Sequence, residues 1–130
     1  MNEELLQKAV MMQQESQETE RKLELIEEQL RELDEFSKGL ELFEKSKEKE
    51  MLASFGKGVY VKSEIKDEKL FVNVGVGVVV RKSAAETKEI IQEQMKRFAQ
   101  ARIQLTAQLE EYSEELGRMI REIEKLRKKN

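Results

Sequence analysis

Apolar residues in the last third of the chain recur at alternating intervals of four and three, without a break. A 3.5-residue repeat held over about five heptads is typical of a left-handed coiled coil rather than an ordinary surface helix. Arg102 is the one position in this stripe that is not apolar. The stripe comprises Ile91, Met95, Phe98, Arg102, Leu105, Leu109, Tyr112, Leu116, Met119, Ile123 and Leu126.

The first third of the chain repeats this spacing with more polar interruptions, and it therefore predicts a partner helix. The last dozen residues are rich in Lys and Arg, whereas the chain starts with Glu3 and Glu4. These opposite charges favour an antiparallel pair, in which the two termini meet at one tip. The second stripe comprises Leu5, Ala9, Met12, Ser16, Thr19, Leu23, Ile26, Leu30, Leu33, Ser37 and Leu40.

Between these stripes the apolar period changes from 3.5 to 2, which predicts β-strands. The run from Gly56 to Gly58 forms a tight turn, and a second turn is expected between Gly75 and Gly77. Two such hairpins bury too little surface to be stable alone in water. Their edges therefore require strands from other chains.

A capping box at Ser83 and Glu86 marks the start of the second helix. We expect a single α+β domain, mostly α, over residues 1–130. It consists of a first coiled-coil helix (1–50), two short β-hairpins for oligomerisation (51–82) and a second coiled-coil helix (83–130). The helices form an antiparallel coiled-coil hairpin, and each extends roughly 65–70 Å at 1.5 Å per residue.

Composition restricts the possible chemistry. The chain has no Pro, Cys, Trp or His, which excludes disulfides, thiol and imidazole catalysis and the usual zinc sites. Gly75 and Gly77 lack the Lys-Ser/Thr of a phosphate-binding loop. The carboxylates fall mainly on solvated helical faces. We expect no enzymatic activity, no cofactor and no metal site.

The chain also shows no sign of membrane insertion. It lacks a basic region followed by an apolar core at its start, and no stretch approaches the roughly 18 consecutive apolar residues that span a bilayer. We expect a cytoplasmic protein without a membrane partner.

The central segment from Leu52 to Ser83 resembles the alpha-class prefoldin subunits. The resemblance is strongest in Val72-Asn73-Val74-Gly75-Val76-Gly77-Val78, which is followed by a charged pair, the cap and a helix. Two β-hairpins lie between the helices in that class, where the beta class has one.

The resemblance implies a hexamer of two alpha and four beta subunits, whose strands join into a β-barrel platform carrying six coiled coils. Some alpha-related subunits form homomeric assemblies, so a homo-oligomer is the alternative assembly. It also implies an ATP-independent chaperone (holdase) that captures unfolded or nascent polypeptides at the coil tips and delivers them to a group II chaperonin. The residues expected to mediate oligomerisation are Val59, Val61, Ile65, Leu70, Val72, Val74, Val76 and Val78.

A holdase requires exposed and adaptable apolar surface. Four apolar residues near the predicted tip fall outside the seam: Leu6, Val10, Met11 and Ile120. They either contact clients or widen the seam of the coiled coil. The candidate client-binding residues are Leu5, Leu6, Val10, Met11, Met119, Ile120, Ile123 and Leu126.

Two other functions are compatible with this pattern. A structural or tethering scaffold would use the same platform to hold one dedicated partner. Nucleic-acid binding would use the basic end between Arg118 and Lys129, but this run is interleaved with Glu122 and Glu124 and lacks aromatic stacking residues. Stabilisation of a helix C-terminus explains these cations better, and we expect no nucleic-acid partner.

Overall fold

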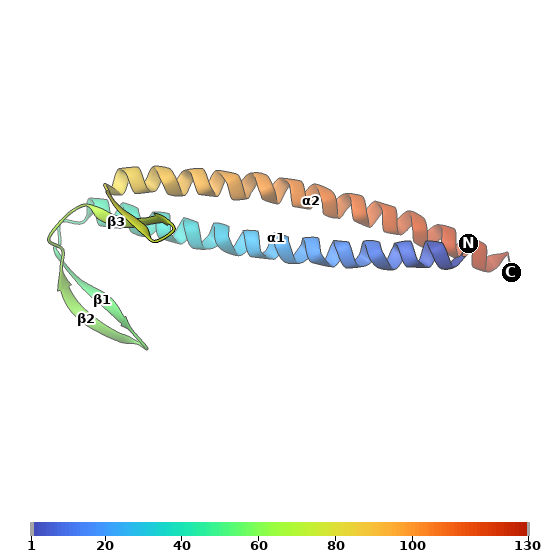
Figure 1. Cartoon of the computed structure of the whole chain (residues 1–130), viewed down its shortest axis with the longest axis horizontal. Helices are drawn as coiled ribbons and strands as arrows, with labels where there is room; N and C mark the ends of the chain where they lie inside the picture. Colours follow the sequence, from blue (N-terminus) through green and yellow to red (C-terminus); the bar gives the residue numbers. More distant parts are fainter. Residues whose placement is uncertain (1, 130) are drawn as a thin grey trace. The chain divides into compact units, whose positions relative to one another are not determined.

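The computed structural model describes residues 2–129 and contains two long helices and four strands (Figure 1). This confirms the predicted fold class of two long helices and two small antiparallel hairpins. No helix in the described part of the chain is long and apolar enough to cross a membrane. The elements are α1 (Asn2–Lys45), β1 (Glu50–Gly56), β2 (Val59–Glu64), β3 (Leu70–Gly75), β4 (Val78–Lys82) and α2 (Ala84–Lys128).

The contacts of the chain divide it into two compact units. The first unit pairs residues 2–31 of α1 with residues 96–129, nearly all of which belong to α2. The second unit is Glu32–Met95 and contains both hairpins with the adjoining helix ends. The prediction of a single domain over residues 1–130 stays a prediction.

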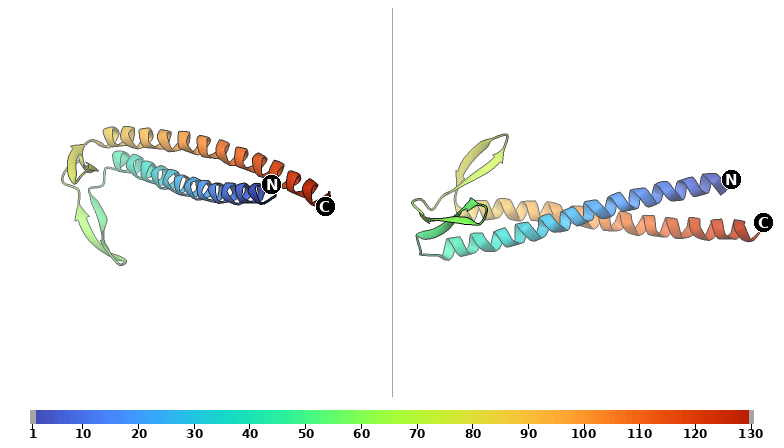
Figure 2. Two further views of the ribbon diagram at one scale, coloured as in Figure 1. Left: turned by 45° about the vertical axis from the view of Figure 1, so that its right-hand side comes forward. Right: turned by 90° about the horizontal axis from the view of Figure 1, so that it is seen from below.

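In the first unit, α1 and α2 run side by side in opposite directions, so the start of α1 and the end of α2 lie at the same end of the unit (Figures 1 and 2). The predicted seam of α1 is confirmed, because its residues are shielded while those between them are exposed. Thr19 is buried at this seam, and its hydroxyl donates to the carbonyl oxygen of Glu15 at 2.9 Å. The buried Thr19 hydroxyl therefore keeps a hydrogen-bond partner within its own helix.

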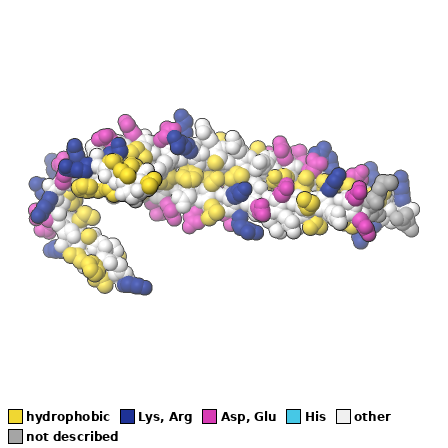
Figure 3. Space-filling model, in the orientation of Figure 1, with side chains coloured by type: hydrophobic (Ala, Val, Ile, Leu, Met, Phe, Trp, Pro, Cys, Tyr) yellow, Lys and Arg dark blue, Asp and Glu magenta, His cyan; other side chains and the backbone are white. Residues whose placement is uncertain are grey.

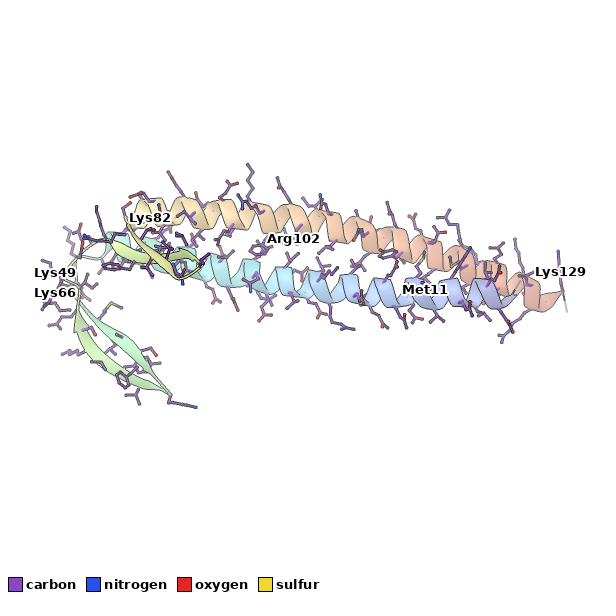
Figure 4. All side chains as sticks on the ribbon, viewed as in Figure 1. Met11, Lys49, Lys66, Lys82, Arg102 and Lys129 are labelled. Carbon is purple, nitrogen blue, oxygen red and sulfur yellow. The ribbon has the colours of Figure 1, made fainter. Side chains whose placement is uncertain are left out.

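The seam of α2 follows the prediction except at two positions. Arg102, which Figure 4 labels, is exposed, and the neighbouring Ala101 in the sequence is half-buried instead. A guanidinium without a partner is costly to bury, so the seam shifts to the small side chain. Leu126, the last seam residue, is 36% exposed.

In the second unit, the helix ends are joined by close packing and one ion pair. Leu40, Ala84 and Thr87 are buried. The Lys88 Nζ donates to Glu41 Oε1 at 2.7 Å, so α1 and α2 are linked where they adjoin the hairpins. This contact lowers the pKa of Glu41 and raises that of Lys88.

The boundaries of the helices differ most from the prediction at the end of α1, whereas α2 begins at Ala84, one residue after the predicted start. The first helix was predicted over residues 1–50, but α1 ends at Lys45, and the Glu48 amide donates to Ser46 Oγ in the linker at 3.2 Å. The capping box is confirmed. The Glu86 amide donates to Ser83 Oγ at 3.1 Å, and the Ser83 amide donates to Glu86 Oε1 at 3.2 Å.

The hairpins are two separate antiparallel sheets, β1 with β2 and β3 with β4. They share one turn geometry, in which Gly56 pairs with Val59 and Gly75 pairs with Val78. Each register shifts just before the turn, so each hairpin carries one extra residue there. Both predicted turns are therefore present, and the second repeats the first nineteen positions later.

Both turns require a left-handed backbone. The two central residues have positive φ in each loop, with Lys57 at 55° and Val76 at 51°, each followed by a glycine. This is the condition for the type I′ turn, which matches the twist of the flanking strands. A β-branched residue is rare in this conformation, so Val76 occupies a position that disfavours it.

Candidate assembly and client-binding surfaces

The coil tip, which we define as residues 3–12 and 118–129, exposes apolar side chains beside the seam. Leu6, Val10, Met11 and Ile120 are between 48% and 61% exposed. They occupy helix positions outside the seam, so packing of α1 on α2 leaves much of each side chain in solvent. The structure thus places apolar surface where the sequence predicted it.

The other predicted client-binding residues lie in the seam. Leu5, Met119 and Ile123 are half-buried between the helices of the first unit, whereas Leu126 is more exposed. Leu5, Met119 and Ile123 therefore present less of their side chains to solvent than the four residues outside the seam. Client binding by all eight residues stays a prediction.

An open groove of about 470 Å³ lies between α1 and α2 in the first unit, away from the tip. The sequence analysis did not predict this groove. A usable signal was present, because the small residue Ala101 lies beside Arg102, a charged residue at a predicted seam position. Ala101 leaves space there that a larger side chain would fill. The groove is lined by Lys22, Leu25, Ile26, Ala101, Gln104, Leu105 and Gln108.

The β1–β2 hairpin carries apolar side chains on both faces. Met51, Val59 and Val61 alternate with Leu52 and Tyr60 along the two strands, and all five are exposed. Figure 3 shows hydrophobic side chains on the surface of this hairpin. Apolar side chains exposed on both faces of a small sheet are typical of a surface that packs against another molecule.

The β3–β4 hairpin differs because one of its faces is shielded. Leu70, Val72 and Val80 are half-buried, whereas Phe71 and Val79 on the opposite face are 68% and 55% exposed. The second hairpin therefore offers one face to a partner rather than two.

On that exposed face, Arg81 contacts both Phe71 and Asp67. The Arg81 guanidinium carbon lies 5.7 Å from the centroid of the Phe71 ring, and the same guanidinium pairs with Asp67. A hydrogen bond from the Lys69 amide and the charge of Arg81 both lower the pKa of Asp67. These contacts hold the Phe71 ring beside a fixed cation.

The predicted oligomerisation residues fall into two groups. Leu70, Val72 and Ile65 are half-buried within the chain, and Ile65 lies one residue beyond β2, where its amide donates to the Lys49 carbonyl. The remaining five are exposed, and Val76 is fully so, at the tip of the second turn. These are Val59, Val61, Val74, Val76 and Val78.

Sequence reasoning missed six exposed apolar side chains of the hairpins, namely Met51, Leu52, Phe55, Tyr60, Phe71 and Val79. Phe71 and Val79 lie on the face opposite the alternating valines, so period-2 counting of one face passed over them. Phe55 is the extra residue before the first turn, where the register shifts. A count of both faces would have found Phe71 and Val79.

The strand edges remain available for pairing. Within residues 2–129, each of the four strands has one hydrogen-bonded neighbour, so each hairpin keeps two unpaired edges. Strands with free edges and apolar faces are templates for pairing with another chain.

These features define a class of protein in which two long coiled-coil helices are joined in sequence by two β-hairpins. Residues 12–129 match the family model described as prefoldin subunit, and the chain belongs to the prefoldin family. This is a family of non-enzymatic chaperones. The predicted resemblance to prefoldin is thereby confirmed.

Among solved structures, the chain is similar to a cryo-EM structure of filamentous PFD from Methanocaldococcus jannaschii, with a TM-score of 0.74. The match covers 92% of this chain and 98% of that one, at 17% sequence identity. At this identity the likeness concerns the fold. No curated protein matches the sequence.

Proposed function

We propose that this chain is an alpha-class prefoldin subunit that acts as an ATP-independent holdase. The observation that carries the proposal is the coil tip, where Leu6, Val10, Met11 and Ile120 stand in solvent beside a formed seam. Folding intermediates present no fixed shape, and loosely distributed Leu and Met side chains adapt to varied partners. The chain would capture unfolded or nascent polypeptides there and deliver them to a group II chaperonin, without catalysing a reaction.

Assembly would proceed through the hairpins. The free strand edges and the exposed apolar faces support pairing with beta-class subunits, two alpha with four beta, into a β-barrel platform in the cytoplasm. Two hairpins per chain are also what the resemblance to the alpha class implies. A homo-oligomer is the alternative assembly to test, and the similar structure is described as filamentous.

A tethering scaffold with one dedicated partner is the competing function. Its partner would follow a regular stripe or groove, as an amphipathic helix does. The open groove at Lys22 and Gln108 is the feature that favours it.

The test is suppression of aggregation of a chemically unfolded model protein, without ATP, with the mass of the assembly measured in parallel. The chain is assayed alone and after co-expression with a beta-class subunit. We expect a defined oligomer that protects several unrelated clients. A defined oligomer that protects none of them would contradict the holdase proposal and favour the scaffold.

A further inference from the structure

The coil tip carries the opposite charge to the rest of the chain. Residues 3–12 and 118–129 contain seven Lys or Arg against four Glu, whereas the remaining residues contain 17 against 23. Figure 4 shows Met11 on α1 and Lys129 following α2 at the same end of the first unit. The tip cations are Lys8, Arg118, Arg121, Lys125, Arg127, Lys128 and Lys129.

Stabilisation of the helix C-terminus accounts for only some of these cations, because that effect fades within the last turn. Arg121 lies two turns before the end of α2, and Arg118 lies further back still. Within residues 2–129, Arg118 has an ion-pair partner, Glu115 at 3.1 Å. The Arg118 and Glu115 side chains of that pair are 65% and 46% exposed.

One flank of the tip combines this charge with apolar surface. Leu6, Ile120 and Arg127 each directly follow a seam residue. In an antiparallel pair, positions of the same type on the two helices lie on the same side of the seam. The open groove is an example of this rule on the other side of the seam. Lys22 and Gln108 each directly precede a seam residue, and both line the groove.

Ile120 and Arg127 are seven residues apart, which is two helical turns and about 10.5 Å along α2. An extended polypeptide covers that distance in about three residues. The acidic neighbours on α2 are Glu122 and Glu124, and those on α1 are Glu3 and Glu4. The seven cations outnumber these four carboxylates, so the tip is net positive and also exposes apolar side chains.

We propose that this flank selects apolar polypeptide segments that are bordered by acidic side chains about three residues away. The inference rests on the proposed client binding and specifies the class of client. Apolar side chains of the client would contact Leu6, Val10 and Ile120, and its carboxylates would lie beside Arg127 and the neighbouring cations. Segments bordered by Lys or Arg would meet like charge and bind less tightly.

The test uses three fluorescent peptides with one apolar core, bordered three residues away by Asp, Ser or Lys. Their Kd values for the assembled full-length chain are measured by anisotropy at low and high salt. We expect the Asp-bordered peptide to bind about three- to fivefold more tightly than the Lys-bordered one at low salt, as exposed ion pairs permit. The difference should shrink in about 0.5 M salt.

Arg127→Gln should reduce the preference for the Asp-bordered peptide while the Ser-bordered peptide binds as before. Lys96→Gln is the matched control, because Lys96 is an exposed cation of α2 outside the tip. Its preference should equal that of the unchanged chain.

Equal Kd values for all three peptides would overturn the charge selection and leave the holdase proposal intact. Failure to bind any of the three would overturn both. Tight binding to vesicles of anionic lipid or to single-stranded RNA, together with no preference among the peptides, would also overturn the inference and assign the cations to another class of partner.

Discussion

The hairpins and the coil tip both leave large apolar side chains in solvent, but they do so on different backbones. The strands carry unpaired N–H and C=O groups along their edges, so a partner must align in register with them. The helices satisfy their own backbone, so the tip offers side chains alone. Exposed apolar surface therefore indicates a partner, and the backbone beneath it indicates how strictly that partner is specified.

The largest effect should follow from charge placed at the second turn. Val74→Asp with Val76→Asp would bury carboxylates in the proposed interface, at a cost of several kcal/mol. Asp tolerates a positive φ, so the turn itself should still form. We expect loss of the oligomer by native mass spectrometry, with helix content unchanged by circular dichroism.

The matched control adds the same charge at two exposed positions of α2, Gln92→Asp and Gln100→Asp. It should assemble normally. A normal oligomer from the hairpin variant would contradict the account of the sheets.

The next effect concerns the tip. Replacing Leu6, Val10, Met11 and Ile120 with Ser should weaken client affinity about tenfold or more, because a buried side chain of this kind contributes ~1.5–3 kcal/mol. The mass of the oligomer should not change. Protection of an aggregating client, titrated against chaperone concentration, measures the loss.

Four exposed apolar residues outside the tip provide the control. Leu25, Phe36, Leu42 and Ile103 are between 51% and 72% exposed. Their replacement with Ser should leave protection near the level of the unchanged chain. Equal loss in both variants would mean that clients bind apolar surface anywhere on the helices.

A smaller effect separates the two turns. Val76→Gly should relieve about 1 kcal/mol or more of left-handed backbone strain, yet weaken assembly by removing an apolar contact. Lys57→Gly relieves similar strain at the matched position of the first hairpin and should preserve assembly. Hydrogen exchange of the turn amides reports the strain, and oligomer mass reports the contact. Identical assembly of the two variants would show that the Val76 side chain plays no part in the interface.

The cap of α2 should matter for stability alone. Ser83→Ala removes the acceptor of the Glu86 amide and should lower the free energy of unfolding by about 1 kcal/mol. Client protection at a temperature well below unfolding should not change. Ser83→Asp supplies another good capping oxygen and should restore most of the stability in a urea titration.

The smallest effect is the pH dependence of the link between α1 and α2. The hydrogen bond and the charge of Lys88 lower the pKa of Glu41, so this contribution to stability is present at neutral pH. It is lost as pH falls through the lowered pKa of the folded state. Lys88, whose pKa is raised, loses its contribution as pH rises through its folded-state value.

Glu41→Gln should flatten the acid limb of a plot of urea midpoint against pH. Asp34→Asn, which breaks an exposed pair with Lys38 on α1, should affect it less. Equal flattening by both substitutions would show that the Glu41–Lys88 ion pair contributes no more to the pH dependence of stability than the exposed Asp34–Lys38 pair.

Much of the fold could be predicted because its signals are local and periodic. The heptad spacing identified the seam of α1 in the first unit, and the capping box located the start of α2. The end of α1 was less predictable, because the charged run after Lys45 suits helix and linker alike. The seam position moves from Arg102 to Ala101 because desolvation of the Arg102 guanidinium would be costly. A repeat pattern contains no information on that cost.

The candidate sites were partly predictable for the same reason. Leu6 and Ile120 stand out as apolar residues beside a regular seam. Phe71 and Val79 were missed because their exposure depends on which face of β3–β4 the rest of the unit shields. That choice depends on tertiary packing rather than on the alternation of apolar and polar residues.

The most direct test of this division between surfaces is photo-crosslinking from one residue at a time. Val10 or Val76 is replaced by a photoreactive amino acid, and the assembled protein is irradiated with an unfolded client present. The account predicts client adducts from position 10 and subunit–subunit adducts from position 76. Client adducts from position 76 with none from position 10, or equal yields of both adducts from each position, would contradict it.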